Sequence, residues 1–277
     1  MRATEARFIE FLDRMLPEFI LPDISEEWIF SADCGVEKKM AGGKIARGIA
    51  RLYVGGLKIF EGRDQEEMGG RLLSAIRDLA TDQSNEFVRC RAGGVAVNGT
   101  GLLLPSAPEP QLPALVALLL RSGARYIGDE LVSIDPILGR MHGLKMPLLI
   151  DAADLVHFPE LGRAANTRRP RGTRAQVEGK TPRTPVRVDE LGAEVSGPTP
   201  VGRIVFPSFS PGARTELQAV GRAEAVFGFT QSILNLHLWR ERTFPFIEAL
   251  LNGATVSRLV VGSLAEAARL LHDDVER

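Results

Sequence analysis

The chain has 277 residues, of which 44% are hydrophobic and 25% charged, and its formal net charge is −1. This near-neutral balance gives no general reason to expect binding to nucleic acid or to an anionic membrane. The two cysteines, Cys34 and Cys90, cannot build a disulfide framework or a cysteine metal cluster, which fits a reducing cytoplasm.

The N-terminal third shows helical and strand patterns in alternation. Thr4–Leu16 predicts an amphipathic helix, and its acidic residues come too early for a signal peptide. Trp28–Ala32 and Ile45–Glu61 are typical of short strands with glycine turns, and Asp64–Ala80 predicts a second helix. We expect residues 1–85 to form a small α+β domain that covers one side of a larger domain.

A strand–loop–helix–strand order follows further along the chain. An apolar strand at Gly101–Leu104 leads through a loop into a helix at 113–123, and a second strand at Arg125–Gly128 ends at the acidic pair Asp129 and Glu130. This is the order of a phosphate-binding strand, loop and helix, followed by a carboxylate that handles a metal or a proton. From periodicity alone, an ordinary βαβ unit is an equally good interpretation.

The loop lacks the residues that bind phosphate in such a unit. The pattern G-x-x-x-x-G-K-[ST] would place its defining residues at Ser106, Gln111, Leu112 and Pro113. Prolines at positions 108, 110 and 113 have no N–H to donate, and Leu112 replaces the lysine that would balance phosphate charge. Glu109 would repel a phosphate at about 4 Å by roughly 4 kcal/mol at an effective dielectric near 20. We expect no ATP binding of the usual kind.

Phe87–Val97, which precedes this unit, predicts a strand or hairpin that contains Arg91. Arg91 could reach a phosphate near the loop, or it could be a solvated arginine at a strand end. Likewise, Asp129 and Glu130 could be catalytic, or they could cap a helix or pair with a nearby arginine.

Residues 163–187 carry eight basic residues against one acid, with three prolines and two glycines. This composition predicts a basic loop without regular structure. It could attract an acidic peptide or a nucleic acid, or it could be a solvated insertion; the absence of stacking aromatic residues argues against nucleic acid.

The rest of the chain predicts further strands and helices. The four histidines have no partners at metal-ligand spacing, so no metal site is predicted. The longest apolar run, Leu112–Leu120, is too short to span a bilayer, and we expect a cytoplasmic protein with no membrane partner. The expected strands lie at 147–150, 201–207 and 258–261, and the expected helices at 223–239, 243–251 and 264–275.

Three segments carry a resemblance to a known family. GLLLP at 101–105, an eight-residue loop and ALVALLLRSGARYIGDELVSIDP at 114–136 resemble the HPr kinase/phosphorylase-related serine kinases, above all the bacterial homologues found beside peptide-modifying or exosortase-type systems. The likeness extends to IVFPSFSPGARTEL at 204–217 and VSRLVVGSLAEAARLL at 256–271.

The resemblance implies an α/β fold: a P-loop domain of the phosphoenolpyruvate-carboxykinase-like type at 86–277, with a mixed sheet and flanking helices. In the family, such a domain transfers phosphate from a nucleotide to a serine of a protein or peptide. The family's acidic residues, which activate the hydroxyl and hold Mg²⁺, map to Asp129 and Glu130. Arg91 stands where the family has a histidine, and the glycine–lysine–serine core is replaced.

These observations favour a catalytically impaired serine-kinase-like protein that serves as a binding or accessory module for a peptide or protein, with no cofactor. The alternative is an active kinase that binds ATP and Mg²⁺ by an unorthodox route, for which Ser106, Gln111 and Arg91 are the candidate nucleotide-binding residues. A third interpretation is a structural partner of an active homologue. Because HPr kinases resemble oligomeric enzymes, a homo-oligomer fits the resemblance as well.

Overall fold

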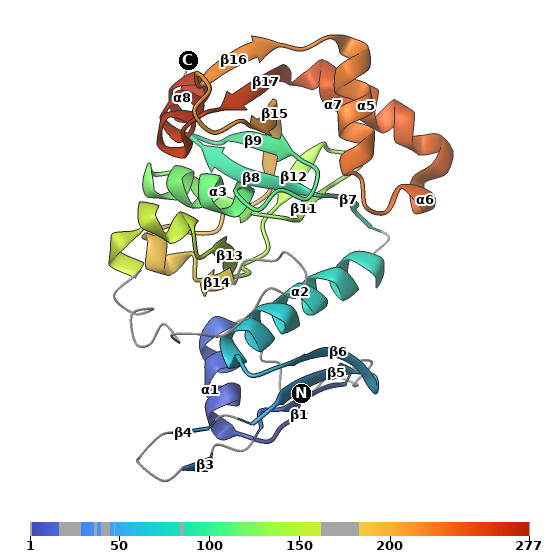
Figure 1. Ribbon diagram of the computed structural model, residues 1–277. Helices are drawn as coiled ribbons and strands as arrows, with labels where there is room; N and C mark the ends of the chain where they lie inside the picture. The colour runs from blue at the N-terminus through green and yellow to red at the C-terminus, as the bar shows by residue number, and fades with distance from the viewer. Residues whose placement is uncertain are drawn as a thin grey trace.

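The computed structural model describes residues 2–16, 29–35, 38–39, 45–46, 48–83, 86–161 and 183–276. It is a mixed α/β protein with a large mixed sheet, flanking helices and a small, mainly antiparallel sheet near the N-terminus (Figure 1). None of the helices in these ranges is long and apolar enough to cross a membrane.

The small sheet has the strand order β1-β2-β5-β6 and packs against two helices. The predicted helices over 4–16 and 64–80 and the strands within 45–61 are confirmed, whereas Trp28 lies outside the described residues. Gly55 and Gly56 turn the chain between β5 and β6 with φ of +53° and +89°, values that glycine adopts without strain. The elements are β1 (Arg2–Ala3), α1 (Ala6–Met15), β2 (Phe30–Asp33), β3 (Lys38–Lys39), β4 (Ile45–Ala46), β5 (Ala50–Val54), β6 (Leu57–Gly62) and α2 (Gln65–Gln83).

The large sheet, nine strands within the described ranges, is ordered β10-β8-β9-β15-β12-β11-β7, with β17 and then β16 added alongside β15. The 11-residue strand β15 pairs in parallel with both β9 and β17 and antiparallel with β12. The strands of the large sheet are β7 (Val88–Cys90), β8 (Ala92–Val97), β9 (Thr100–Pro105), β10 (Arg125–Gly128), β11 (Val132–Ile134), β12 (Arg140–His142), β15 (Thr199–Phe209), β16 (Glu216–Ala219) and β17 (Thr255–Val261).

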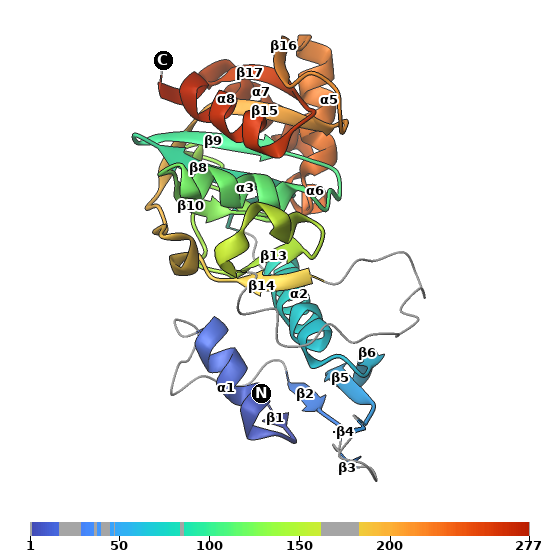
Figure 2. The same cartoon turned by 60° about the vertical axis from the view of Figure 1, so that its left-hand side comes forward.

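Helices cover both faces of this sheet (Figures 1 and 2). One apolar cluster packs the sheet against α3 and α8 together with the ribbon of β13 and β14, and a second packs the opposite face against α5 and α7. The remaining elements are α3 (Leu112–Arg121), β13 (Leu148–Asp151), η2 (Asp154–His157), β14 (Arg183–Val186), η3 (Asp189–Leu191), α5 (Arg222–Ser232), α6 (Leu236–Trp239), η4 (Arg240–Arg242), α7 (Thr243–Gly253) and α8 (Leu264–Glu276).

The predicted strand–loop–helix–strand unit is present as β9, α3 and β10. β8 is antiparallel to both β9 and β10, so these two strands run parallel with β8 between them. A Cβ on Gly93 of β8 would lie 2.8 Å from a methyl group of Val116, so glycine at this position lets α3 approach the sheet closely. Because β9 and β10 run parallel, their carboxyl ends lie at the same edge of the sheet.

Two sequence predictions need correction. The basic loop was predicted to extend to residue 187, but Arg183–Val186 forms β14 and pairs with β13; residues 162–182 lie outside the described part of the chain. Pro185 is tolerated there because a strand of a two-stranded ribbon has one edge that needs no hydrogen bonds. The single helix predicted over 223–239 is divided into α5 and α6, because Ile233 is extended and bridges Cys90 of β7.

Candidate functional site

The backbone brings several of the predicted site residues to one edge of the large sheet. The Ser106 N–H donates to the Arg91 carbonyl at 3.2 Å, and the Ala92 N–H donates to the Glu130 carbonyl at 3.3 Å. Arg91, Ser106 and the acidic pair are therefore neighbours in space, at the edge of the sheet where β9 and β10 end. Gln111 begins α3 at the far end of the loop.

Three N–H groups of the loop donate hydrogen bonds within the protein. Residues 106–113 include three prolines and five residues with an N–H. The Gln111 N–H reaches the Glu109 carboxylate at 3.4 Å, the Leu112 N–H donates to the Glu109 carbonyl at 3.2 Å, and the Ser106 N–H is bonded as above. Glu109 thus supplies a negative group where an anion would bind at the N-terminus of a helix.

The Gln111 side chain is also engaged. Its amide lies near enough to the carboxyl group of Asp154, a residue that is 7% exposed, to affect the pKa of that group. Burial raises the pKa of Asp154, as does the charge of Asp151, and the Gln111 amide opposes this shift. The start of α3 therefore faces a second internal carboxyl group.

Asp129 is buried in a polar network at the end of β10. It is 1% exposed, its Oδ1 lies 3.3 Å from Nη2 of Arg77 on α2, and the Tyr126 hydroxyl donates to the same oxygen at 3.0 Å. Arg77 is itself 6% exposed and donates further to the Pro147 carbonyl at 3.4 Å. An arginine from the N-terminal third of the chain thus neutralises a carboxylate of the large sheet.

Glu130 is held between two arginines. One of its carboxylate oxygens pairs with Arg77 and the other lies 2.6 Å from Nη1 of Arg183 on β14. Arg183 also pairs through Nε with Asp151 at 3.1 Å. We call Arg77, Asp129, Glu130, Arg183 and Asp151 the acid–arginine network.

The electrostatics follow from burial and charge together. Burial raises the pKa of Asp129, and the charge of Arg77 opposes that rise. Burial acts to lower the pKa of Arg77, but the charges of Asp129 and Glu130 outweigh it, so the pKa is raised. Burial and then the Asp129 charge raise the pKa of Tyr126 well above its usual value. The guanidinium group therefore stays charged, and the Tyr126 hydroxyl stays protonated.

Sequence reasoning located Asp129 and Glu130 but missed their partners Arg77, Arg183 and Tyr126. The sequence did hold one signal for Arg77: it follows the apolar Leu73 by one helical turn, so both residues lie on the same face of α2. The structure buries Leu73 completely. No local pattern links either arginine to the acidic pair. Within the described ranges, no group of three or more histidine, cysteine, aspartate or glutamate side chains has the arrangement of a metal site.

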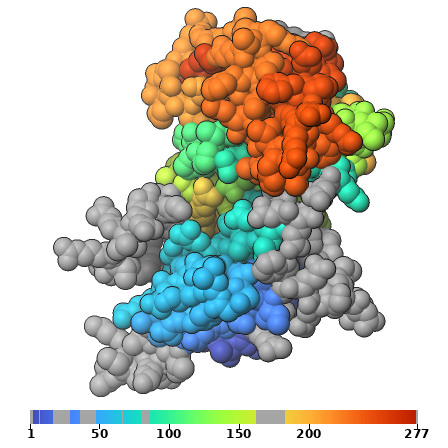
Figure 3. All heavy atoms as spheres, turned by 90° about the vertical axis from the view of Figure 1, so that its right-hand side faces the viewer, coloured from blue at the N-terminus to red at the C-terminus, as the bar shows by residue number. Residues whose placement is uncertain are grey.

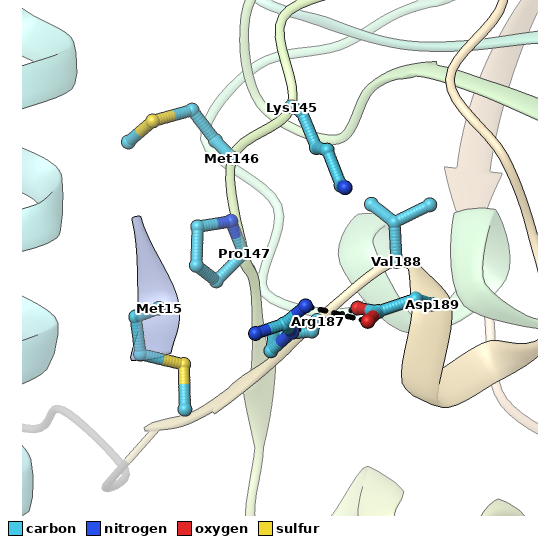
Figure 4. A pocket seen from close by; sticks show the side chains of 7 residues that line it. All are labelled: Met15, Lys145, Met146, Pro147, Arg187, Val188 and Asp189. Atoms are coloured by element: carbon cyan, nitrogen blue, oxygen red, sulfur yellow. Dashed lines mark hydrogen bonds and ion pairs between the residues drawn. The ribbon is translucent and has the colours of Figure 1, made fainter. Parts of the chain in front are cut away.

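A small pocket is lined by the 145–147 segment, whose Pro147 carbonyl accepts a hydrogen bond from Arg77 of the network (Figure 4). Its volume of about 10 Å³ is far below the roughly 300–1,000 Å³ typical of ligand sites. Met15 of α1 faces Arg187 across it, and Arg187 pairs with Asp189 at 2.5 Å. Arg187 also donates to the Arg14 carbonyl at 2.5 Å, so it fastens the end of α1 to the segment after β14.

Comparison of the sequence with models of protein families found no match, and comparison with curated proteins found none either.

Proposed function

We propose that this protein is a catalytically impaired member of the HPr kinase/phosphorylase-related serine kinases, with a P-loop domain of the phosphoenolpyruvate-carboxykinase-like type. In this proposal it acts as a binding or accessory module in a bacterial system that modifies peptides or proteins. The observation that carries the proposal is the pairing of both acidic residues, Asp129 and Glu130, with Arg77 and Arg183.

The pairing opposes both roles that the acidic residues have in an active kinase. A general base must come within hydrogen-bonding reach of the seryl hydroxyl, whereas Asp129 is 1% exposed and its Oδ1 already accepts two hydrogen bonds. Magnesium is usually held by one or two free carboxylates together with substrate phosphates. Arg77 competes for both carboxylates with its own positive charge.

The loop supports the same conclusion independently. Phosphate transfer depends on positioning and on electrostatic stabilisation of the phosphoryl oxygens. Here Glu109 occupies the N–H groups of Gln111 and Leu112, and Gln111 turns its side chain to Asp154. Of the candidate nucleotide-binding residues, this leaves the side chains of Arg91 and Ser106 to attract phosphate, without a lysine or a glycine-rich backbone.

Calorimetric titration of the full chain with ATP and Mg²⁺, followed by ADP and GTP, tests the proposal. We expect no binding below about 1 mM nucleotide, and no transfer of labelled phosphate to peptides encoded by neighbouring genes. Micromolar binding that is lost in Asp129→Asn but kept in Asp135→Asn would overturn the proposal in favour of an active kinase. Asp135→Asn is the matched control because the Asp135 carboxylate accepts hydrogen bonds from the Ile137 and Leu138 N–H groups and pairs with no arginine or lysine within the described residues.

A further inference from the structure

Helix α2 joins the small sheet to the larger part of the molecule. It lies between the small sheet and the ribbon of β13 and β14 in both ribbon views, and its cyan atoms lie between the same two parts in the space-filling view (Figures 1, 2 and 3). Met68 and Leu72 pack into the apolar cluster of the small sheet, whereas Leu73 packs with Leu149 of β13. One turn after Leu73, the same helix carries Arg77 into the acid–arginine network. The seating of α2 therefore decides where this guanidinium group lies.

The guanidinium group of Arg77 lies among three oxygen atoms. Its Nη1 pairs with a carboxylate oxygen of Glu130, and its Nη2 lies 3.3 Å from Asp129 Oδ1 and 3.4 Å from the Pro147 carbonyl oxygen. Two carboxylates and a backbone carbonyl thus converge on one cationic group. Carboxylate and carbonyl oxygens are the ligands that hard divalent cations such as Mg²⁺, Mn²⁺ and Ca²⁺ prefer. The oxygens around Arg77 therefore have the chemistry of a divalent cation site that a side chain occupies.

Asp129 has a second oxygen that this arrangement does not satisfy. Its Oδ2 is buried and makes no hydrogen bond among the described residues, although the Leu149 N–H lies near enough to lower the pKa of the carboxyl group. Buried acceptors are nearly always paired, so an orphaned carboxylate oxygen calls for an explanation. Arg77 reaches Oδ1 alone, whereas a metal ion can bind a carboxylate through both of its oxygens.

The charge of the acid–arginine network points the same way. Its three carboxylates, Asp129, Glu130 and Asp151, carry three negative charges, and its two arginines, Arg77 and Arg183, carry two positive ones, which leaves −1. A divalent cation in place of the Arg77 guanidinium would bring this sum to zero. Buried charges are tolerated when they are paired, so the balance of charge within the network favours a divalent cation over the arginine.

We propose that Arg77 is an internal plug, an autoinhibitory contact in which α2 holds a guanidinium group in a divalent cation site made by Asp129, Glu130 and the Pro147 carbonyl. The arginine keeps this site because the helix tethers it there at a high effective concentration. Removing the guanidinium group opens the site to Mg²⁺, Mn²⁺ or Ca²⁺. This inference rests on the proposed function, in which the acidic pair is occupied, and adds that the oxygen ligands beneath the plug are intact.

Titration of the full chain with Mn²⁺ alone, followed by the loss of the electron paramagnetic resonance signal of the free ion, tests the plug. We expect no binding to the wild-type chain below about 5 mM Mn²⁺, and binding at least about 10-fold tighter to Arg77→Ala. Arg77→Ala/Asp129→Asn should lose that binding again. The matched control is Arg125→Ala, which removes an exposed arginine whose ion pair with Glu194 lies outside the network, and it should bind Mn²⁺ no better than the wild type.

Thermal unfolding followed by circular dichroism shows whether Arg77→Ala is folded, since the change removes a buried ion pair. An ion that binds only the folded state stabilises it, so Mn²⁺ should raise the melting temperature of Arg77→Ala and leave that of the wild type unchanged. If Arg77→Ala is unfolded without metal, Mn²⁺ should restore its native spectrum. An Arg77→Ala chain that stays unfolded in Mn²⁺, Mg²⁺ and Ca²⁺ alike would refute the plug.

Three binding results would also overturn the inference. They are a folded Arg77→Ala that binds no Mn²⁺, equal affinities in Arg77→Ala and the wild type, and an affinity that Asp129→Asn leaves unchanged in the Arg77→Ala background. The first of these would leave the proposed function standing, because the wild-type chain would still bind no nucleotide. Micromolar nucleotide binding by the wild type would instead refute the proposed function, whatever Mn²⁺ does in Arg77→Ala.

Discussion

Replacing Arg77 with methionine tests whether the acid–arginine network stabilises the fold. Methionine keeps much of the length of the side chain and removes its charge. Arg77 is 6% exposed, pairs with Asp129 and Glu130, and donates to the Pro147 carbonyl. Breaking a buried pair by removing one partner costs about 3–5 kcal/mol, because the other charge stays buried without compensation. We expect a loss in the free energy of unfolding of that size at pH 8.

The loss should depend on pH. Burial already raises the pKa of Asp129 while Arg77 opposes the rise, so removing Arg77 raises that pKa further. When the folded state has the higher pKa, it binds the proton more tightly than the unfolded chain. The contribution of Asp129 to the stability of the variant is therefore fully present at low pH, and it is lost as the pH rises from about 4 through the raised pKa of Asp129. The penalty of Arg77→Met should therefore be smaller at pH 5 than at pH 8.

Urea unfolding followed by circular dichroism at both pH values measures this penalty. Arg125→Met is the matched control, since its ion pair with Glu194 has side chains 55% and 79% exposed and is worth at most about 1 kcal/mol. Arg77→Met/Asp129→Asn should recover part of the loss at pH 8, because it removes the uncompensated charge. A cost of Arg77→Met no greater than that of Arg125→Met, or the same cost at both pH values, would refute the reasoning.

Three further predictions concern the core and the turns. Gly128→Ala should destabilise the protein by more than about 2 kcal/mol in urea unfolding, because its Cβ would lie 2.2 Å from the Leu131 carbonyl oxygen. A variant as stable as the wild type would contradict this close approach of residue 128 to Leu131. Gly253→Ala, with nothing within 4 Å of the new methyl group, should instead add about 0.5–1 kcal/mol by the same measurement. Burial raises the pKa of the Cys90 thiol to about 12, so this cysteine should react with a chromogenic disulfide reagent at pH 8 only after denaturation, and rapid native labelling would be inconsistent with its place in the core.

The sequence determined most of the local structure. The apolar runs over 101–104 and 125–128 and the helix between Pro113 and Gly123 were predicted and are present as β9, β10 and α3. These signals are local, because periodicity and terminal residues act within a few positions of the chain. The acidic pair was placed correctly at the end of β10 for the same reason.

Long-range pairing decided what the patterns could not. The predicted helix over 223–239 is interrupted because residues near 233 pair with β7, where the Leu234 N–H donates to the Arg89 carbonyl at 2.8 Å. Arg183–Val186 is a strand because β13 offers it a partner, although its proline and its arginine favour a loop. In both segments tertiary hydrogen bonds outweigh local propensity.

The state of the candidate site was likewise decided by the tertiary structure alone. The sequence raised two alternatives for Asp129 and Glu130, catalysis or pairing with an arginine, and left both open. Arg77 and Arg183 lie 52 to 54 positions away along the chain, on opposite sides of the acidic pair. Their approach depends on how α2 and β14 pack. For Arg77 and Asp129, whose side chains are 7% and 1% exposed, the pairing is required because a buried charge is tolerated only beside an opposite one.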